Sequence, residues 1–531
     1  MNEKIILDGL WDFSFNGGPR MKMPVPGCFD ASGPYRGERG QGAYSRRVNG
    51  SGPMELNCDG LGLRASFFWD GREIGREVSA FAPVRIRFDA GESGDHELKI
   101  VCDNTIEDAP ESEFRRFYDF YGYGGIYRSV SLRRLPSAFF DSVRVYPDPE
   151  NGILRIRMKL SGSERETEVR IDGTRCGTFS GSGEAPFRIP SPELWSPESP
   201  RLHSLELDCG TDRFSCRFGL RKIEVSGGKI LLNGKPLRIA GVNRHDVFPD
   251  TGAAVSPERL RQDLTMIKNA GFNMIRGSHY PQSQAMLDLA DELGLLVWDE
   301  ILGWENPLES LTNREFQRRQ VSSLTRMIES SLHHPSVLFW GFLNEAATDD
   351  PAARDCVKLL YRTAKELDPD RLVTYATMHG EKDVCLDLVD AVCFNTYPGW
   401  YSGTHLFFEK RIVTEPLKKL ISFVRSTPAI ADKPVLISEI GAGALVGDHS
   451  GRRWSEEYQS QLIECAVSCT LEDPECSGIL LWQFCNTPVD DNGRIMMRPR
   501  GFNNKGLVDE FRNPKLAWNL FPGLLKRLGI R

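Results

Sequence analysis

Eight short apolar runs that alternate with helical stretches occupy the second half of the sequence, from Lys229 onward. Their near-continuous Val, Ile and Leu content is typical of parallel strands that are buried on both faces. Eight strand–helix units in about 300 residues predict a (β/α)8 TIM barrel, here over residues 225–531. The predicted strands are residues 237–242, 272–276, 295–299, 337–343, 372–376, 391–394, 435–438 and 478–484.

The first 224 residues have a different pattern, which predicts two all-β domains. Short alternating runs are interrupted by Gly, Pro and Asp, and helical periodicity is absent from residues 1–134. We expect a jelly-roll-like β-sandwich over residues 1–134 and an immunoglobulin-like β-sandwich over residues 135–224. Within the first sandwich, residues 65–69 and 84–88 are expected as strands on either side of a turn at 70–73. The predicted fold class is therefore multidomain, β plus α/β.

Charge, hydropathy and cysteine usage exclude several classes of protein. The chain has 66 Lys and Arg against 73 Asp and Glu, a balance that argues against a nucleic-acid binder. No apolar run approaches 18 residues, so no membrane span is expected. The 13 cysteines are scattered without a C-x-x-C pair, and the N-terminal residues lack the apolar core of a signal peptide. We therefore expect reduced thiols and a cytoplasmic location.

Two glutamates directly follow apolar strands of the predicted barrel, at the end where such barrels carry their chemistry. Glu345 follows the fourth strand and Glu439 the seventh. Burying an ionisable glutamate at this position costs free energy, so its presence favours a functional role. Two carboxyl groups facing one cleft are what glycoside hydrolysis needs, one protonated and one ionised. The alternative is that each glutamate caps its strand or pairs with Arg276, which could also hold the nucleophile ionised.

Other polar and aromatic side chains follow the remaining strands. His245 and His279 end the first two strands and are either substrate contacts or satisfied core residues. Their spacing with Asp299 does not fit a metal site, so neither a metal nor an organic cofactor is expected. Tyr397 and Trp482 lie at the predicted barrel mouth, where aromatic rings suit the C–H faces of a sugar.

Taken together, these residues resemble glycoside hydrolase family 2, the family of β-galactosidase, β-glucuronidase and β-mannosidase. The resemblance implies a retaining mechanism on β-glycosides, with Glu345 as acid/base and Glu439 as nucleophile. It further implies that Asn344 bonds the 2-hydroxyl, that Tyr397 holds the nucleophile and that Trp482 forms the sugar platform. The motifs that carry it are Leu-Trp-Asp-Phe at 10–13, Val-Pro-Gly at 25–27, Tyr-Ser-Arg-Arg at 44–47, Gly-Gly-Ile-Tyr-Arg at 124–128, Gly-Val-Asn-Arg-His-Asp at 241–246, Ser-His-Tyr-Pro at 278–281, Asn-Glu at 344–345 and Ser-Glu at 438–439.

The segment after the eighth strand bears on which sugar is recognised. Asn503 and Lys505 match the Asn-x-Lys pattern of β-glucuronidases, in which the pair grips the C6 carboxylate. A uronate needs a cation and an amide donor, whereas a neutral hexose would leave the cation unpaired. Asp119, and the segment from Asn395 to Tyr401, also resemble this β-hexuronidase subgroup. The alternative for Lys505 is a solvated loop lysine.

We therefore expect a retaining exo-glycosidase that hydrolyses terminal β-D-glucuronides. A β-galacturonidase is the first alternative and a β-galactosidase the second. A non-catalytic carbohydrate-binding protein should have lost Glu345 or Glu439, and both are present. The expected partner is a small-molecule or oligosaccharide β-uronide, without nucleic acid or membrane, and the resemblance implies a homo-oligomer. The retaining mechanism predicts about 5–5.5 Å between the two carboxyl groups.

Overall fold

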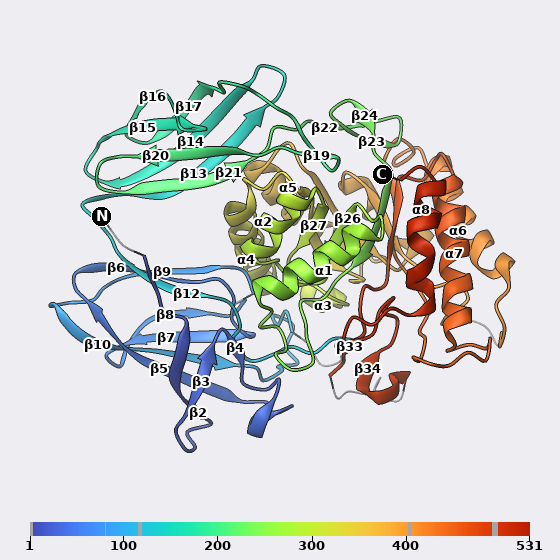
Figure 1. The fold of residues 1–531 in the computed structure, drawn as a ribbon, viewed down its shortest axis with the longest axis horizontal. Coiled ribbons are helices and arrows are strands. Elements are labelled where there is room, and N and C mark those ends of the chain that lie inside the picture. The colour runs from blue at the N-terminus through green and yellow to red at the C-terminus, as the bar shows by residue number, and fades with distance from the viewer. Residues whose placement is uncertain (1–3, 80, 115–118, 402–404, 491–496, 531) are drawn as a thin grey trace.

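The computed structural model describes residues 4–79, 81–114, 119–401, 405–490 and 497–530. Two β-sandwiches lie on one side of a closed barrel, the first drawn in blue and the second in teal and green (Figure 1). The barrel and its helices form the other half of the molecule, with the last helices farthest from the sandwiches (Figure 1). This arrangement confirms the predicted multidomain fold class.

The first sandwich packs a six-stranded sheet against a four-stranded sheet. Its core is made of inward-facing side chains such as Trp11, Phe67 and Leu98. The six strands in sheet order are β3 (Met21–Val25), β2 (Gly9–Phe15), β5 (Gln41–Gly50), β10 (Gly94–Asp103), β7 (Arg64–Trp69) and β8 (Arg72–Glu77). The four are β1 (Ile5–Ile6), β12 (Val130–Arg134), β6 (Pro53–Cys58) and β9 (Val84–Asp89). The 3-10 turn η1 (Gly33–Tyr35) and the pair β4 (Gly27–Cys28) and β11 (Gly125–Ile126) complete this domain.

One strand pairing in this sandwich differs from the expectation. The turn after β7 does not lead to residues 84–88 but to β8, which begins at Arg72 and pairs with β7. Asp70 and Gly71 both have positive φ, as a tight hairpin turn requires. Strand β9 instead pairs with β6 in the other sheet. The sequence does not predict strand β8, because four of its six residues are charged and none is buried, which leaves no apolar alternation.

The second sandwich consists of a three-stranded and a four-stranded antiparallel sheet. Along β14 the side chains of Leu154, Ile156 and Met158 are buried while Arg155 and Arg157 are exposed, the period of two that a half-buried strand requires. The three strands are β13 (Ala138–Asp148), β14 (Ile153–Gly162) and β17 (Gly183–Arg188). The four are β16 (Thr174–Ser180), β15 (Glu166–Ile171), β20 (His203–Asp208) and β21 (Arg213–Phe218).

Short strands close the N-terminal end of the barrel. Ile230 and Trp195 from this region pack in one cluster with Ile239, Met274 and Leu296, which lie at or near the beginnings of barrel strands. The closed end leaves the opposite, C-terminal end for chemistry. The short strands are β18 (Trp195–Ser196), β19 (Ser199–Pro200), β22 (Ile223–Ser226), β23 (Lys229–Leu232) and β24 (Lys235–Pro236).

Eight parallel strands close the barrel, and each corresponds to one of the eight predicted runs. The first and the last pair directly with each other, which closes the ring. The strands are β25 (Ile239–Asn243), β26 (Met274–Gly277), β27 (Leu296–Glu300), β28 (Val337–Asn344), β29 (Leu372–Thr377), β30 (Val392–Asn395), β31 (Val435–Ile440) and β32 (Gly478–Leu481).

Helices cover the outside of the barrel, and side-chain caps set where several of them begin. Ser256, Ser283, Asn313 and Ser455 each accept a hydrogen bond from a backbone amide of the first turn. No helix in the described part of the chain combines the length and apolarity that a membrane span requires. The helices are α1 (Pro257–Asn269), α2 (Gln284–Leu293), α3 (Leu308–Leu311), α4 (Arg314–Ser331), α5 (Arg354–Leu367), α6 (Lys410–Ser426), α7 (Glu456–Glu472) and α8 (Phe521–Arg527).

Two connections depart from a regular strand–helix repeat. Between β29 and β30 the described chain forms only the 3-10 turns η3 (Gly380–Lys382) and η4 (Leu386–Leu388). After the last barrel strand, the C-terminal segment forms two short elements in place of one regular helix: the 3-10 turn η7 (Leu516–Leu520) and α8, whose first turn contains Pro522. A 3-10 turn, η2 (Pro351–Ala353), also precedes α5.

The segment after β32 folds back over the barrel mouth. It contains the paired strands β33 (Thr487–Pro488) and β34 (Phe502–Asn503) and the turn η6 (Pro499–Gly501). The amide of Tyr121, from the first sandwich, donates to the carbonyl of Pro488 at 3.2 Å. The first domain therefore reaches the end of the barrel where the predicted site residues lie.

Candidate active site

Arg276, at the end of β26, lies at the centre of the candidate site. Its guanidinium is fully buried and donates to both oxygens of Glu300 at 2.9 Å and to Asn243 Oδ1 at 3.0 Å. It also donates to Glu439 Oε1 and to Asn344 Oδ1, both at 2.7 Å. An arginine remains charged under all conditions relevant to the protein, so it supplies a fixed cation for the two carboxylates.

Glu439 lies near the end of β31 and is almost completely buried. Arg276 donates to its Oε1, and the hydroxyl of Tyr397 donates to its Oε2 at 2.6 Å. Both oxygens therefore accept hydrogen bonds, as those of an ionised carboxylate do. This is the arrangement that a carboxylate nucleophile needs.

Glu345 follows β28 directly and has very different surroundings. Its amide donates to the carbonyl of Ala376 on β29 at 2.9 Å, and its φ of 55° turns the side chain out of the strand direction. Its Oε1 accepts from the amide of Asn395 at 2.9 Å. Burial, together with the nearby charge of Glu439, raises the pKa of Glu345 to about 8. This carboxyl group is therefore protonated at neutral pH and can donate its proton.

Two asparagines orient the polar groups between the glutamates. Asn395 accepts from the Ser438 hydroxyl at 2.8 Å and donates to both Asn344 Oδ1 and Glu345 Oε1, which fixes which way its amide points. The oxygen of Asn344 accepts from Arg276 and Asn395. Its Nδ2 is buried and has no hydrogen-bond partner among the described residues. A buried donor of this kind is available to a ligand.

His245, His279 and Trp482 form one wall of the site. The rings of His279 and Trp482 stack at 5.1 Å, and the His245 ring meets Trp482 edge-on at 5.6 Å. Burial and the charge of Arg276 lower the pKa of His279 to about 3, and burial lowers the pKa of His245 well below its usual range. Both imidazoles are therefore neutral. Within the described structure, Nε2 of His245 is buried without a partner.

Lys505 and Tyr401 meet at the same mouth. The Lys505 side chain is buried, its Nζ donates to the Tyr401 hydroxyl at 2.5 Å, and the ammonium lies over the rings of Tyr401 and Tyr397 at 4.8 and 5.4 Å. Among the residues that the structure describes, no carboxylate forms an ion pair with it. A buried ammonium without a counter-ion is unfavourable, so this position suits an anionic group of a ligand.

Asp119 comes from the first domain and contacts Arg498 and Asn503. It accepts two hydrogen bonds from Arg498, at 2.7 and 2.6 Å, and one from the amide of Asn503 at 2.8 Å. Arg498 also donates to the Tyr401 hydroxyl at 3.1 Å. Asp119 thus links the two domains, and its contact with sugar hydroxyls stays a prediction.

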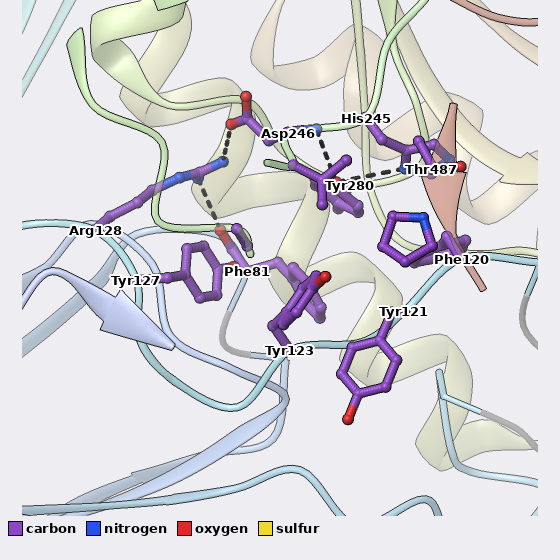
Figure 2. Close-up of a pocket in the computed structure, with 13 residues that line it drawn as sticks. Phe81, Phe120, Tyr121, Tyr123, Tyr127, Arg128, His245, Asp246, Tyr280 and Thr487 are labelled. Atoms are coloured by element: carbon purple, nitrogen blue, oxygen red, sulfur yellow. Dashed lines mark hydrogen bonds and ion pairs between the residues drawn. The ribbon is translucent and has the colours of Figure 1, made fainter. Parts of the chain in front are cut away.

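A pocket between the first domain and the barrel lies next to His245 (Figure 2). Aromatic rings from both domains line it, among them Phe120 and Tyr280. Arg128 approaches Asp246 at 3.5 Å and donates to the carbonyl of Phe81 at 3.4 Å (Figure 2). It also donates to the carbonyl of Pro281, in the barrel, at 2.9 Å. The first domain is therefore tied to the barrel directly behind the histidine wall.

Three residues of this network were not predicted. Glu300 follows the apolar run of the third strand, the same signal that marked Glu345 and Glu439, and could have been found. Asn243 ends the first strand and was passed over for its histidine neighbour. Arg498 precedes Asn503 in a basic segment, but no local pattern indicates its partner Asp119.

Potential metal ligands come together in one place in the described chain, and it is not this site. Asp288, Asp291 and His334 lie close enough to hold an ion. Asp291 accepts from His334 at 2.6 Å and from the amide of Ser336 just before β28, at the opposite end of the barrel. These contacts make it part of the structural core there.

This chain contains a (β/α)8 barrel with two unlike glutamates at the ends of its fourth and seventh strands, an arrangement that indicates the class of glycoside hydrolases. Comparison with known families gives a narrower assignment. The model for the TIM barrel domain of glycosyl hydrolases family 2 matches residues 223–520, and a second model of the same family matches residues 142–221. The chain belongs to glycoside hydrolase family 2.

The chain is similar to several characterised members. The β-glucuronidase of Rattus norvegicus is 30% identical over 422 residues, which are 75% of this chain but only 63% of the rat protein. A GH2 β-galacturonidase from Eisenbergiella tayi, solved with galacturonate, superposes with a TM-score of 0.93 at 32% identity over 100% of this chain and 98% of its own. A β-glucuronidase from Faecalibacterium prausnitzii gives a TM-score of 0.88 at 26% identity over 99% and 98%.

Proposed function

We propose that the chain is a retaining exo-β-hexuronidase that removes a terminal β-linked glucuronic acid. The observation that carries the proposal is the buried Lys505 ammonium, which has no carboxylate partner in the described structure. It lies over the ring of Tyr397, whose hydroxyl donates to Glu439. The relatives described above, which are named as β-glucuronidases and a β-galacturonidase, support the same substrate class.

Hydrolysis would proceed in two displacement steps. In the first, Glu439 attacks the anomeric carbon while protonated Glu345 donates its proton to the leaving oxygen. In the second, Glu345 takes a proton from water, and that water releases the sugar from Glu439. The raised pKa of Glu345 supports its role as the acid, and the donors from Arg276 and Tyr397 support the role of Glu439. Retention predicts about 5–5.5 Å between the carboxyl groups.

The remaining residues would recognise the sugar. The unpartnered Nδ2 of Asn344 would donate to the 2-hydroxyl, and Trp482, which stacks on His279, would provide an apolar face. Lys505 and Asn503 would bind the C6 carboxylate. A neutral hexose would leave the Lys505 ammonium buried and without a counter-ion, and this penalty would favour a uronide.

A β-galacturonide is the second candidate substrate. The observation that favours it is the 32% identity over the full chain to the Eisenbergiella tayi β-galacturonidase, against 26% to the Faecalibacterium prausnitzii β-glucuronidase. The two sugars differ at one hydroxyl and share the carboxylate that Lys505 would bind. Both candidates therefore depend on the same pair of residues, Asn503 and Lys505, which we call the carboxylate clamp.

Hydrolysis of three chromogenic β-glycosides tests the proposal: a glucuronide, a galacturonide and a galactoside. We expect wild-type protein to prefer a uronide, and Lys505→Ala to lower kcat/KM for it by at least about thirtyfold, the cost of removing one partner of a buried charge pair. Lys433→Ala is the matched control, since that lysine bonds the carbonyl of Asp387 outside the site. Strong galactoside turnover that Lys505→Ala leaves unchanged would contradict the proposal.

A further inference from the structure

Lys515 is a second buried lysine near the site, and its partners are all neutral. Its side chain is 1% exposed. Its Nζ donates three hydrogen bonds of 2.9 Å, to the carbonyl of Ala444, to Asn486 Oδ1 and to the carbonyl of Asn504. An ammonium has three donors, so its capacity is used completely.

Each acceptor belongs to a different part of the barrel mouth. Ala444 lies in the loop after β31, the strand that carries Glu439. Asn486 lies in the loop after β32 and Trp482. Asn504 stands between Asn503 and Lys505. The Lys515 side chain therefore connects the loop that follows Glu439, the loop that follows Trp482 and the carboxylate clamp.

Other contacts also hold the clamp segment. The Gln483 amide donates to the carbonyl of Lys505 at 3.1 Å, and the Gly506 amide donates to Asn486 Oδ1 at 3.2 Å. The side-chain amide of Asn504 donates to the carbonyls of Pro499 and Phe502, which folds the segment on itself. Its own carbonyl receives the Ala444 amide at 3.0 Å in addition to Lys515. The Asn504 carbonyl is thus one of the points that attach the folded segment to the barrel.

Burial changes the pKa of Lys515, and a neighbouring hydrogen bond fixes its backbone. Burial lowers its pKa to about 7, although the carboxylates of Glu456 and Glu510 act in the opposite direction. Glu456, on α7, accepts a hydrogen bond from the amide of Leu516 at 2.7 Å, which fixes the backbone next to Lys515. A lysine is rarely buried among neutral acceptors alone, and these three acceptors belong to three different loops, so a positioning role accounts for it better than space filling does.

We propose that Lys515 is a positioning residue for the carboxylate clamp. It holds the Asn504 carbonyl so that the flanking Asn503 amide and Lys505 ammonium stay in place for a uronate carboxylate. This inference rests on the proposed function, because it assigns Lys515 to uronide recognition. It predicts an effect on uronide binding that exceeds any effect on the chemical step.

Lys515→Met tests this role, with Lys268→Met as the matched control. Lys268 also donates to two backbone carbonyls, those of Pro197 and Gly294, but lies away from the site. For chromogenic β-glucuronide and β-galacturonide we expect Lys515→Met to raise KM about tenfold or more, with kcat within about threefold. The inhibition constants of free D-glucuronate and D-galacturonate should rise in parallel. Lys268→Met should change the melting temperature alone.

Lys515→Gln provides a second, gentler variant, since its amide keeps two donors. We expect it to fold and to raise the uronide KM by an intermediate amount. An unchanged KM in Lys515→Gln, or a loss of kcat alone in Lys515→Met, would overturn the positioning role. A wild-type protein that hydrolyses the galactoside but neither uronide would instead contradict the proposed function. The two failures are therefore distinguishable.

Discussion

Glu345 and Glu439 carry the same carboxyl group in unlike surroundings. Arg276 and Tyr397 donate to both oxygens of Glu439, whereas Glu345 receives one amide hydrogen bond and faces the charge of Glu439. Such differences allow two carboxyl groups in one site to act as nucleophile and acid. The roles therefore follow from neighbouring residues.

The raised pKa of Glu345 predicts the alkaline limit of activity. We expect kcat/KM for the preferred β-glycoside to fall about tenfold per pH unit above about pH 8, because the acid must be protonated for the first step. Glu345→Gln should remove this descending limb along with most of the activity. A rate profile that stays flat from pH 7 to pH 10 would contradict the assignment.

The same group predicts a pH-dependent stability. The pKa of Glu345 rises from its ordinary 4.5 to about 8, so the folded state binds the proton more tightly than the unfolded state. Its stabilising contribution is present below pH 4.5 and is lost as the pH rises through 8. Glu345→Gln, which cannot ionise, should therefore gain melting temperature relative to wild type between pH 5 and pH 9. A melting-temperature difference between Glu345→Gln and wild type that is the same at pH 5 and at pH 9 would contradict the raised pKa of Glu345.

The Tyr397 hydroxyl is expected to support the nucleophile. Tyr397→Phe removes the hydrogen bond to Glu439 Oε2 and should lower kcat about tenfold, the usual worth of a bond to a charged group. Melting temperature serves as the control for folding. A kcat equal to that of wild type would show that the hydroxyl has no part in the reaction.

Sequence patterns located the glutamates because each follows an apolar run at the end of a strand. The same pattern applied to Glu300. The sequence suggested Arg276 as a partner of the nucleophile, and the structure adds that Arg276 joins Glu300 to Glu439. An arginine's partners depend on side-chain direction in three dimensions, which residue order alone does not determine.

At the scale of elements, the inside of the barrel limits what β28 can carry. A Cβ on Gly341 would lie 2.2 Å from Trp298 Nε1 and 2.6 Å from Glu300 Cβ. The Trp298 ring lies beneath the Arg276 guanidinium at 4.8 Å. Close packing at this glycine therefore supports the central arginine.

Gly341→Ala should destabilise the fold by about 1–3 kcal/mol through overpacking and should lower activity by displacing Glu300. Gly523→Ala is the matched control, since a Cβ there meets nothing within 4 Å and α8 would gain helix propensity. Chemical denaturation and glycosidase assays measure both. A Gly341→Ala protein as stable and active as wild type would show that the neighbours can move.

Elements with a clear periodicity could be predicted, and those without it could not. All eight barrel strands are apolar runs, because each is buried on both faces. Strand β8 escaped prediction because its exposed charged residues carry no alternation.

At the scale of the whole molecule, the first domain contributes to the barrel site. Asp119 and Arg498 are 379 residues apart in sequence but form an ion pair with two hydrogen bonds. No local pattern could have predicted this contact, since it exists only when the two domains are docked. The first sandwich domain therefore supplies Asp119 to the candidate site.

Asp119→Ala should lower kcat/KM for the preferred uronide by at least about tenfold, because it leaves Arg498 unpaired beside the clamp. The double variant Asp119→Ala/Arg498→Met should lose less than the sum of the single losses, as expected of coupled partners. Independent, additive losses in this double-mutant cycle would show that the ion pair does not act as a unit.

The most direct measurement is the stereochemical course of uronide hydrolysis, followed by proton NMR of the anomeric signal. We predict that wild-type protein releases the β-anomer of the free uronic acid first from a β-glucuronide or β-galacturonide, and that the α-anomer appears later by mutarotation. Initial release of the α-anomer, or no hydrolysis of either uronide, would contradict the double displacement by Glu439 and Glu345.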